Sequence, residues 1–130
     1  MLRELLYLVL FVGVSSQYAP GKMQEVINVR QVPGKTAYTV PQNLSAYDGF
    51  MAMRDCNELG NEYYLRPKNS TKWEHFLVVD CSGHAETSQW MLRNNIIAEV
   101  DYASALRWNT IGKGIDIEIA QRILPGYAIE

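Results

Sequence analysis

Several absences restrict what this chain of 130 residues can be. It has no internal repeat, and its one long apolar run is too short for the ~20 residues that a membrane-spanning helix needs. Basic residues are not in excess, because 12 Lys and Arg face 14 Asp and Glu, which leaves no electrostatic case for a nucleic-acid partner. Hydrophobic residues make up 48% and include 3 Trp. We therefore expect one small domain with its own core.

Cysteine is also scarce, with only Cys56 and Cys81 in the chain. In an oxidising compartment the default for two cysteines is a disulfide. The alternative is a metal site, because Cys81 and His84 have ligand-like spacing. That site would also need Cys56 and a ligand such as His75, and no second close ligand pair exists. The sequence therefore favours a Cys56–Cys81 disulfide, with no metal and no cofactor.

The N-terminal segment has the pattern of an export signal. One early positive charge at Arg3 precedes an apolar run over residues 5–14, and small residues follow at Ser15 and Ser16. We predict a secretory signal peptide over residues 1–16, cleaved near Ser16. A buried N-terminal helix or an uncleaved anchor is the alternative. On the signal interpretation the mature protein is a soluble monomer, secreted or held in the periplasm or cell envelope, and meets the membrane only through the signal.

The rest of the chain has the pattern of a β-rich domain. Alternation and turn residues predict strands over residues 25–32, 36–40, 49–54, 62–66, 71–80, 96–100 and 115–119. Short helices are predicted over residues 88–93 and 102–108, the second with Asp101 at its N-cap. Residues 17–24 are expected to be a mobile leader and residues 67–70 a hairpin tip. Many short strands with few helices indicate a small closed barrel.

One segment has special chemical interest. The strand-forming run Phe76–Val79 ends abruptly in Asp80, followed by Cys81 and a Ser-Gly turn. A strand that ends in a carboxylate can hold a functional acid on a rigid scaffold. The same arrangement can also simply cap a loop, and the residues alone leave both interpretations open.

The order of these motifs resembles a double-psi β-barrel of the rare lipoprotein A and barwin/expansin-like superfamily. In those proteins a Thr-Ala-Ala-His segment precedes a Gly turn, a strand ends in Asp-Arg-Gly-Pro or a related turn, and Ile-Asp-Leu-Ser opens a helix. The matching segments here are Tyr47-Asp48, Met51-Ala52-Met53-Arg54, Gly60, Asp80-Cys81-Ser82-Gly83 and Val100-Asp101-Tyr102-Ala103. The resemblance covers roughly residues 43–120. It implies an all-β fold, a small six-stranded double-psi barrel with short helices, whose core spans residues 43–130 after a leader and first strands at 17–42.

The resemblance also implies a site. Asp80 falls on the acid/base group of the members that cut peptidoglycan, whereas Arg54 stands where those members have a histidine. A lytic transglycosylase needs only one such carboxyl group, which first donates and then accepts a proton. Possible substrate-binding residues are Arg54, Asp48, His84, Asp101, Trp73 and Trp90.

Three functions follow from these residues. The first is an exported enzyme that cleaves peptidoglycan with Asp80 as acid/base, in the manner of a lytic transglycosylase. The second is a non-catalytic, expansin-like barrel that binds cell-wall polysaccharide. The third is a structural or protein-binding barrel. An open cleft beside Asp80 that is lined by Trp or Tyr would favour the first two over the third.

Overall fold

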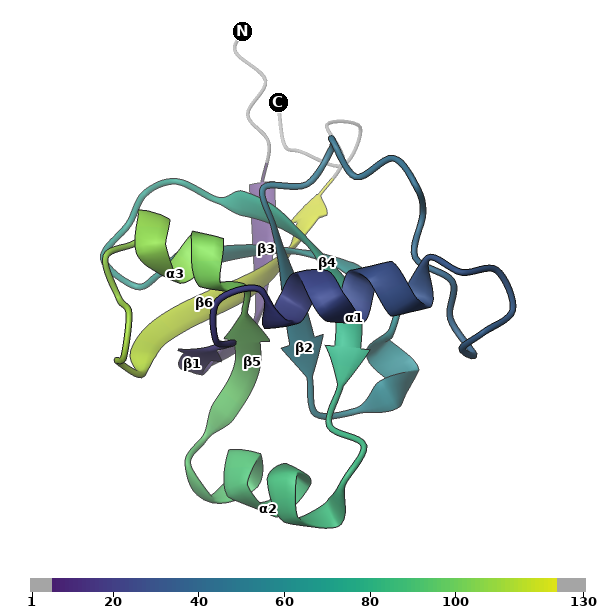
Figure 1. Ribbon diagram of the computed structural model, residues 1–130. Coiled ribbons are helices and arrows are strands. Elements are labelled where there is room, and N and C mark those ends of the chain that lie inside the picture. The colour runs from purple at the N-terminus through teal and green to yellow at the C-terminus, as the bar shows by residue number, and fades with distance from the viewer. Residues whose placement is uncertain (1–5, 124–130) are drawn as a thin grey trace, which may run out of the picture.

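The computed structural model describes residues 6–123, which form a closed six-stranded β-barrel with three short α-helices and one 3-10 helix (Figure 1). The strands are β1 (Leu6–Gln17), β2 (Gly49–Met53), β3 (Glu62–Pro67), β4 (Glu74–Cys81), β5 (Ile96–Val100) and β6 (Ile115–Ile123). The helices are α1 (Lys22–Arg30), the 3-10 helix η1 (Cys56–Glu58), α2 (Ala85–Arg93) and α3 (Tyr102–Arg107). The predicted fold class, a small six-stranded barrel with short helices, is confirmed.

The strand order around the barrel is β1-β5-β2-β4-β3-β6, and β6 pairs with β1 to close it. The pairs β1–β5 and β2–β4 are parallel, and the other four pairs are antiparallel. If β1, β2 and β3 are exchanged with β4, β5 and β6 in that order, the same strand pairs result, and each pair stays parallel or antiparallel as before. The topology therefore has an internal two-fold relation, although the sequence contains no repeat.

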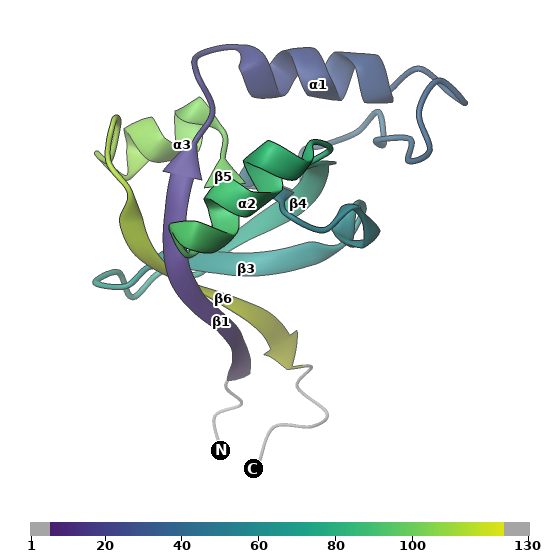
Figure 2. The same ribbon diagram turned by 90° about the horizontal axis from the view of Figure 1, so that it is seen from below.

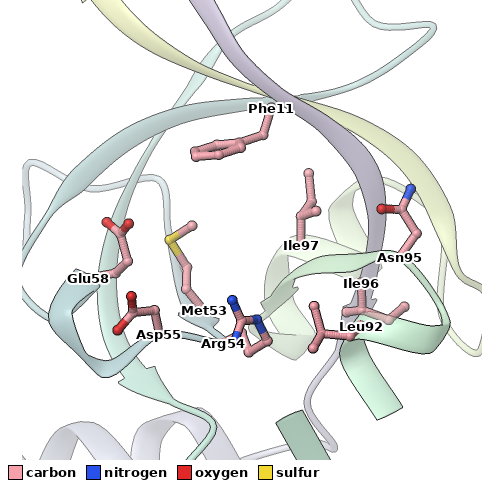
Figure 3. Close-up of a pocket in the computed structure, with 9 residues that line it drawn as sticks. All are labelled: Phe11, Met53, Arg54, Asp55, Glu58, Leu92, Asn95, Ile96 and Ile97. Carbon is pink, nitrogen blue, oxygen red and sulfur yellow. The ribbon is translucent and has the colours of Figure 1, made fainter. Parts of the chain in front are cut away.

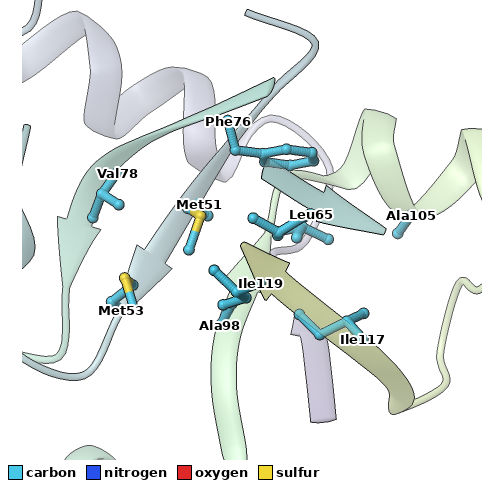
Figure 4. Packing of buried hydrophobic residues seen from close by; sticks show 10 residues of the cluster. Met51, Met53, Leu65, Phe76, Val78, Ala98, Ala105, Ile117 and Ile119 are labelled. Carbon is cyan, nitrogen blue, oxygen red and sulfur yellow. The ribbon is translucent and has the colours of Figure 1, made fainter. Parts of the chain in front are cut away.

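The barrel interior is filled by side chains from five of its strands and from α3. The buried cluster consists of Met51, Met53, Leu65, Phe76, Val78, Ala98, Val100, Ala105, Ile117 and Ile119 (Figure 4). Phe76 is its largest fully buried side chain and lies with its ring centroid 5.8 Å from that of Trp108. Side chains alternate between the two faces of a strand, so β6 places Ile117 and Ile119 inside and keeps Glu118 outside.

A second buried cluster lies on the outside of the barrel, beneath α1. It contains Met23 and Ile27 of α1, Val40 of the following loop, and Leu77 and Val79 of β4. Figure 2 shows α1 covering this side of the barrel. Because β4 is buried on both faces, its sequence is a continuous apolar run rather than an alternating one.

The N-terminal apolar run has a structural role that the signal interpretation did not anticipate. Residues 6–17 form β1, which pairs with both β5 and β6. The barrel therefore extends outside the predicted core range of residues 43–130. Removal of the signal stays a prediction, and cleavage after Ser16 would take away almost all of β1. In the described part of the chain, no helix has the length and apolarity needed to cross a membrane.

The predicted elements between residues 17 and 40 are wrong. The expected strand at 25–32 is the helix α1, and the expected leader at 17–24 contains the end of β1 and the first turn of α1. Gly21, at φ 77°, provides the left-handed turn before the helix, and Met23 and Ile27 bury one helical face at a spacing of four. The expected strand at 36–40 is a loop, tied to α1 by a hydrogen bond from Val40 N to Arg30 O of 2.9 Å. After residue 48 the predicted strands, helices and hairpin are confirmed to within a few residues.

Candidate functional site

Asp80 owes its position to an irregularity in β4. In the β2–β4 pair, Met51 aligns with Val78 but Ala52 aligns with Asp80, so Val79 is an extra residue. Val78 points into the barrel, whereas Val79 packs in the outer cluster and Asp80 bonds to groups outside the barrel. Bulges commonly re-aim a side chain in this way. Asp80 is therefore presented on the outer face, next to α1.

Two donors hold the Asp80 carboxylate. The Tyr18 hydroxyl donates to Oδ2 at 2.6 Å, and Nη2 of Arg30 donates to Oδ1 at 3.2 Å. The Asp80 side chain keeps 19% of its surface exposed and that of Arg30 keeps 17%. Burial and the hydrogen bond to Asp80 raise the pKa of Tyr18, so its phenol stays protonated and acts as a donor. Arg30, the last residue of α1, is the cation that pairs with Asp80.

A second carboxyl group lies across the same outer face. Ala52 of β2 aligns with Asp80 on one side and with Glu99 of β5 on the other, and Glu99 aligns with Ser16 of β1. The Ser16 hydroxyl donates to Oε2 of Glu99 at 3.0 Å. Burial raises the pKa of Glu99, the Ser16 hydrogen bond opposes this, and the charge of Asp80 adds to it. Glu99 was not predicted as a site residue, although the burial pattern of β5 alternates and places Glu99 on the outer face.

A pocket of about 290 Å³ opens beside Asp80. It is lined by Glu25, Val26, Val29 and Arg30 of α1, by Thr36 of the next loop, and by Asp80. Apolar side chains form one wall, and a carboxylate, a guanidinium and a hydroxyl supply polar groups. This combination is typical of small-molecule sites, where a few polar groups orient a ligand on an apolar surface.

Asp48 and Asp101, both predicted to bind substrate, lie together but at a different pocket of about 430 Å³. Asp101 occupies the N-cap position of α3, as predicted, but its Oδ1 accepts from Phe50 N at 3.1 Å and from Ser104 Oγ at 2.6 Å. Oδ2 of Asp48 accepts from His75 N at 2.8 Å. The two carboxylates therefore tie β2, β4 and α3 together at the end of the barrel.

Arg54 lies at a third pocket of about 300 Å³ rather than beside Asp80 (Figure 3). Asp55 and Glu58 share the polar side of this pocket with Arg54, and its apolar lining is Phe11, Met53, Leu92, Ile96 and Ile97. The carboxylate Oε1 of Glu58 already accepts from Tyr63 at 2.6 Å.

The remaining predicted residues are not among those that line the pocket beside Asp80. His84 is exposed at the N-cap position of α2, and Trp90, on the same helix, is 40% exposed. Trp73 is half-buried before β4, with the guanidinium of Arg66 lying 4.2 Å from its ring centroid. The Asp80 carboxylate accepts hydrogen bonds from Tyr18 and Arg30, neither of which was predicted as a site residue.

The predicted disulfide is confirmed. Cys56 and Cys81 are bonded, with their Cα atoms 5.0 Å apart, so η1 is joined to the residue that follows Asp80. Because both sulfur atoms are in the disulfide, the alternative metal site with His84 does not form. Within residues 6–123 no group of three or more potential ligands could hold a metal ion.

Comparison with models of known protein families finds no match for the chain. A search of curated proteins also finds none. The fold and the site together define a small closed barrel with a carboxylate-centred site on its outer face.

Proposed function

We propose that this protein is an exported domain that binds cell-wall glycan, peptidoglycan above all, at the outer-face site around Asp80. One observation carries the proposal: Asp80 is partly exposed beside a pocket of about 290 Å³, and Arg30 and Tyr18 hold it in a fixed orientation. Sugars present closely spaced hydroxyl groups on a partly apolar ring. A carboxylate acceptor next to a guanidinium donor and an apolar wall complements that pattern.

Two further features support this class of function. The closed six-stranded barrel with its two parallel strand pairs agrees with the resemblance to double-psi barrels. The Cys56–Cys81 disulfide supports export, because disulfides persist in oxidising compartments. The resemblance then supplies the substrate class, cell-wall polysaccharide.

A lytic transglycosylase is the second candidate function. The observation that favours it is the rigid placement of Asp80, which lies at a bulge in β4 directly before a disulfide-bonded residue. In this role the Asp80 carboxyl would protonate the glycosidic oxygen and then accept a proton from the sugar's own hydroxyl. The products would carry anhydro ends, and no water would be consumed.

Sedimentation with purified peptidoglycan sacculi tests the proposal. We expect Asp80→Asn to weaken binding about tenfold or more, because hydrogen bonds to a charged group contribute ~1.5–3 kcal/mol. The matched control is Asp116→Asn, which changes an exposed carboxylate at the start of β6. Circular dichroism and thermal melting establish that each variant is folded.

The outcomes separate the candidate functions. Equal binding by the wild type and folded Asp80→Asn would overturn the proposed site. No binding to sacculi, chitin or cellulose would leave a structural or protein-binding role. Anhydro-sugar products that disappear in Asp80→Asn would establish the lytic activity.

A further inference from the structure

We propose that the pocket around Arg54 is a second binding site, and that it takes a free α-amino acid with an apolar side chain. This pocket has a volume of about 300 Å³, and none of its described lining residues belongs to the pocket beside Asp80. The inference therefore goes beyond the proposed function and does not depend on it.

The pocket exists because β1 extends past the start of the strand beside it. β1 pairs with β6 from Leu6 onwards, but it pairs with β5 only from Val14 onwards, in register with Ile96. Phe11 lies in the part of β1 that has no β5 residue next to it. It aligns with Ile119 of β6, which is buried inside the barrel, and the side chains of aligned residues share one face. Phe11 therefore faces the space that β5 leaves open at this end of the barrel (Figure 3).

Apolar side chains from β1, β2, α2 and β5 line the pocket. Met53 of β2 belongs to the barrel core and also lines the pocket, so the pocket opens at one end of the barrel interior. Ile96 and Ile97 of β5 and Leu92 of α2 form the rest of the apolar lining together with Phe11. Phe11 is 41% exposed and Leu92 is 55% exposed, so both leave apolar surface open to solvent. An apolar ligand group that covers this surface would gain free energy from its burial.

Three charged groups lie beside this apolar lining. Arg54 is exposed, and its guanidinium forms no hydrogen bond or ion pair within residues 6–123. Asp55 accepts from the backbone N–H of Asn57 at 2.9 Å through Oδ1, and Glu58 accepts from the Tyr63 hydroxyl at 2.6 Å through Oε1. In the same part of the chain, no donor bonds to Oδ2 of Asp55 or to Oε2 of Glu58. The pocket therefore offers one free guanidinium and two free carboxylate oxygens to a ligand.

These groups complement the two charged ends of a free amino acid. A guanidinium matches the planar geometry of a carboxylate, and an ammonium group, which only donates, suits the carboxylate oxygens. Figure 3 shows Asp55 and Glu58 on one side of Arg54, and Leu92 and Ile96 on the other. An apolar amino acid can therefore place its carboxylate at Arg54, its ammonium toward the two acids, and its side chain against the apolar lining.

Charge and size restrict the ligand further. One cation and two carboxylates give the pocket a net charge of 1 − 2 = −1, which disfavours an apolar carboxylate that has no ammonium group. The unpaired Arg54 in turn disfavours an apolar amine that has no carboxylate. The volume of about 300 Å³ has room for roughly ten atoms the size of a water molecule, and leucine has about nine non-hydrogen atoms. Leucine is therefore a suitable probe.

NMR titration of the full chain with L-leucine tests the inference. We expect saturable shifts of the amide signals of Arg54, Asp55, Leu92 and Ile97, with a Kd at or below about 1 mM. Glycine lacks the apolar side chain and should bind about tenfold more weakly or worse. Leucinamide lacks the carboxylate and N-acetylleucine lacks the ammonium group, and each should also lose about tenfold or more in affinity.

Two variants assign each charged group of the pocket to one end of the ligand. In Arg54→Gln, leucine and leucinamide should bind equally weakly, whereas N-acetylation should still reduce affinity. Asp55→Asn should instead reduce the effect of N-acetylation and keep the effect of amidation, and asparagine can keep the N-cap role that Asp55 has in η1. The matched control is Arg93→Gln, which changes an exposed arginine that follows Leu92 and is not a lining residue of this pocket. This control should bind leucine within about twofold of the wild type, because an exposed charge outside the pocket is screened.

Each alternative result has a distinct meaning. The absence of saturable shifts with leucine in the folded wild type overturns the inference. Equal binding of N-acetylleucine and leucine overturns it in favour of the C-terminal end of a peptide, and equal binding of leucinamide overturns it in favour of the N-terminal end. Leucine binding that is unchanged in folded Arg54→Gln also overturns it. Sedimentation of Arg54→Gln with sacculi keeps the two proposals apart, because glycan binding at Asp80 should be unaffected by the loss of Arg54.

Discussion

Removal of the Cys56–Cys81 disulfide should destabilise the barrel by an amount that follows from chain length. The two residues are 25 apart in sequence. In the loop-closure model the disulfide lowers the entropy of the unfolded chain by about 2.1 + 1.5R ln n cal/mol/K, where n is the number of residues in the loop. For n near 25 this entropy corresponds to a free energy of about 3.5 kcal/mol at room temperature. For a domain of this size such a change lowers the melting temperature by roughly 10 °C or more. Cys56 is exposed and Cys81 half-buried, so serine at both positions buries no new polar group.

Equilibrium urea unfolding of the wild type and of the Cys56→Ser/Cys81→Ser variant measures this difference. The m-value should stay the same or rise, because the unfolded chain without the cross-link exposes more surface. Wild-type protein under a reducing agent is the internal control and should match the variant. A difference below about 1 kcal/mol would refute the reasoning, since it would mean that the unfolded chain is already restricted without the bond.

Three other changes test separate parts of the fold. Phe76→Ala removes the largest fully buried side chain of the barrel and should lower the unfolding free energy by ~3–5 kcal/mol in urea titration, and a loss under about 1 kcal/mol would contradict the assigned core. Burial raises the folded-state pKa of Glu99 above its ordinary value of 4.5. The contribution of its protonated carboxyl to the free energy of unfolding is therefore complete below that pH, and it is lost as the pH rises through the raised pKa. Glu99→Gln should therefore gain stability relative to the wild type between about pH 4 and pH 7, and a constant difference across that window would be inconsistent with burial of this carboxyl. A chain of residues 17–130 lacks all but the last residue of β1 and should lose cooperative thermal unfolding, whereas a cooperatively folding product would show that the barrel tolerates cleavage after Ser16.

Sequence patterns predicted the second half of the fold well because local periodicity and burial agree there. Residues 115–119 of β6 alternate between isoleucine and a carboxylate, and their side chains divide in the same way between the barrel core and the outside. The first half failed because the same signal is ambiguous in short segments. In α1 only Met23 and Ile27 are fully buried, so the helical periodicity of its hydrophobic residues is weak. The alternation of apolar and polar residues in this segment therefore led to the wrong prediction of a strand.

The site was predictable only in part, for a related reason. Asp80 stood out because an apolar strand ends at it, and the disulfide followed from having only two cysteines. The hydrogen-bond partners of Asp80 are Tyr18 and Arg30, which lie 62 and 50 residues away in the chain, and no local sequence pattern indicates them. The bulge at Val79 is likewise a property of strand register. Without the bulge, the regular alternation of side chains along β4 would point Asp80 into the barrel.

The measurement that tests the central claim most directly is amide NMR mapping of the full chain during titration with soluble peptidoglycan fragments. We predict that saturable chemical-shift changes concentrate at Tyr18, Arg30, Asp80 and Glu99, and that Asp80→Asn abolishes them while Asp116→Asn leaves them in place. Changes centred instead on the Arg54 pocket of Figure 3, or equal changes in Asp80→Asn, would contradict the account.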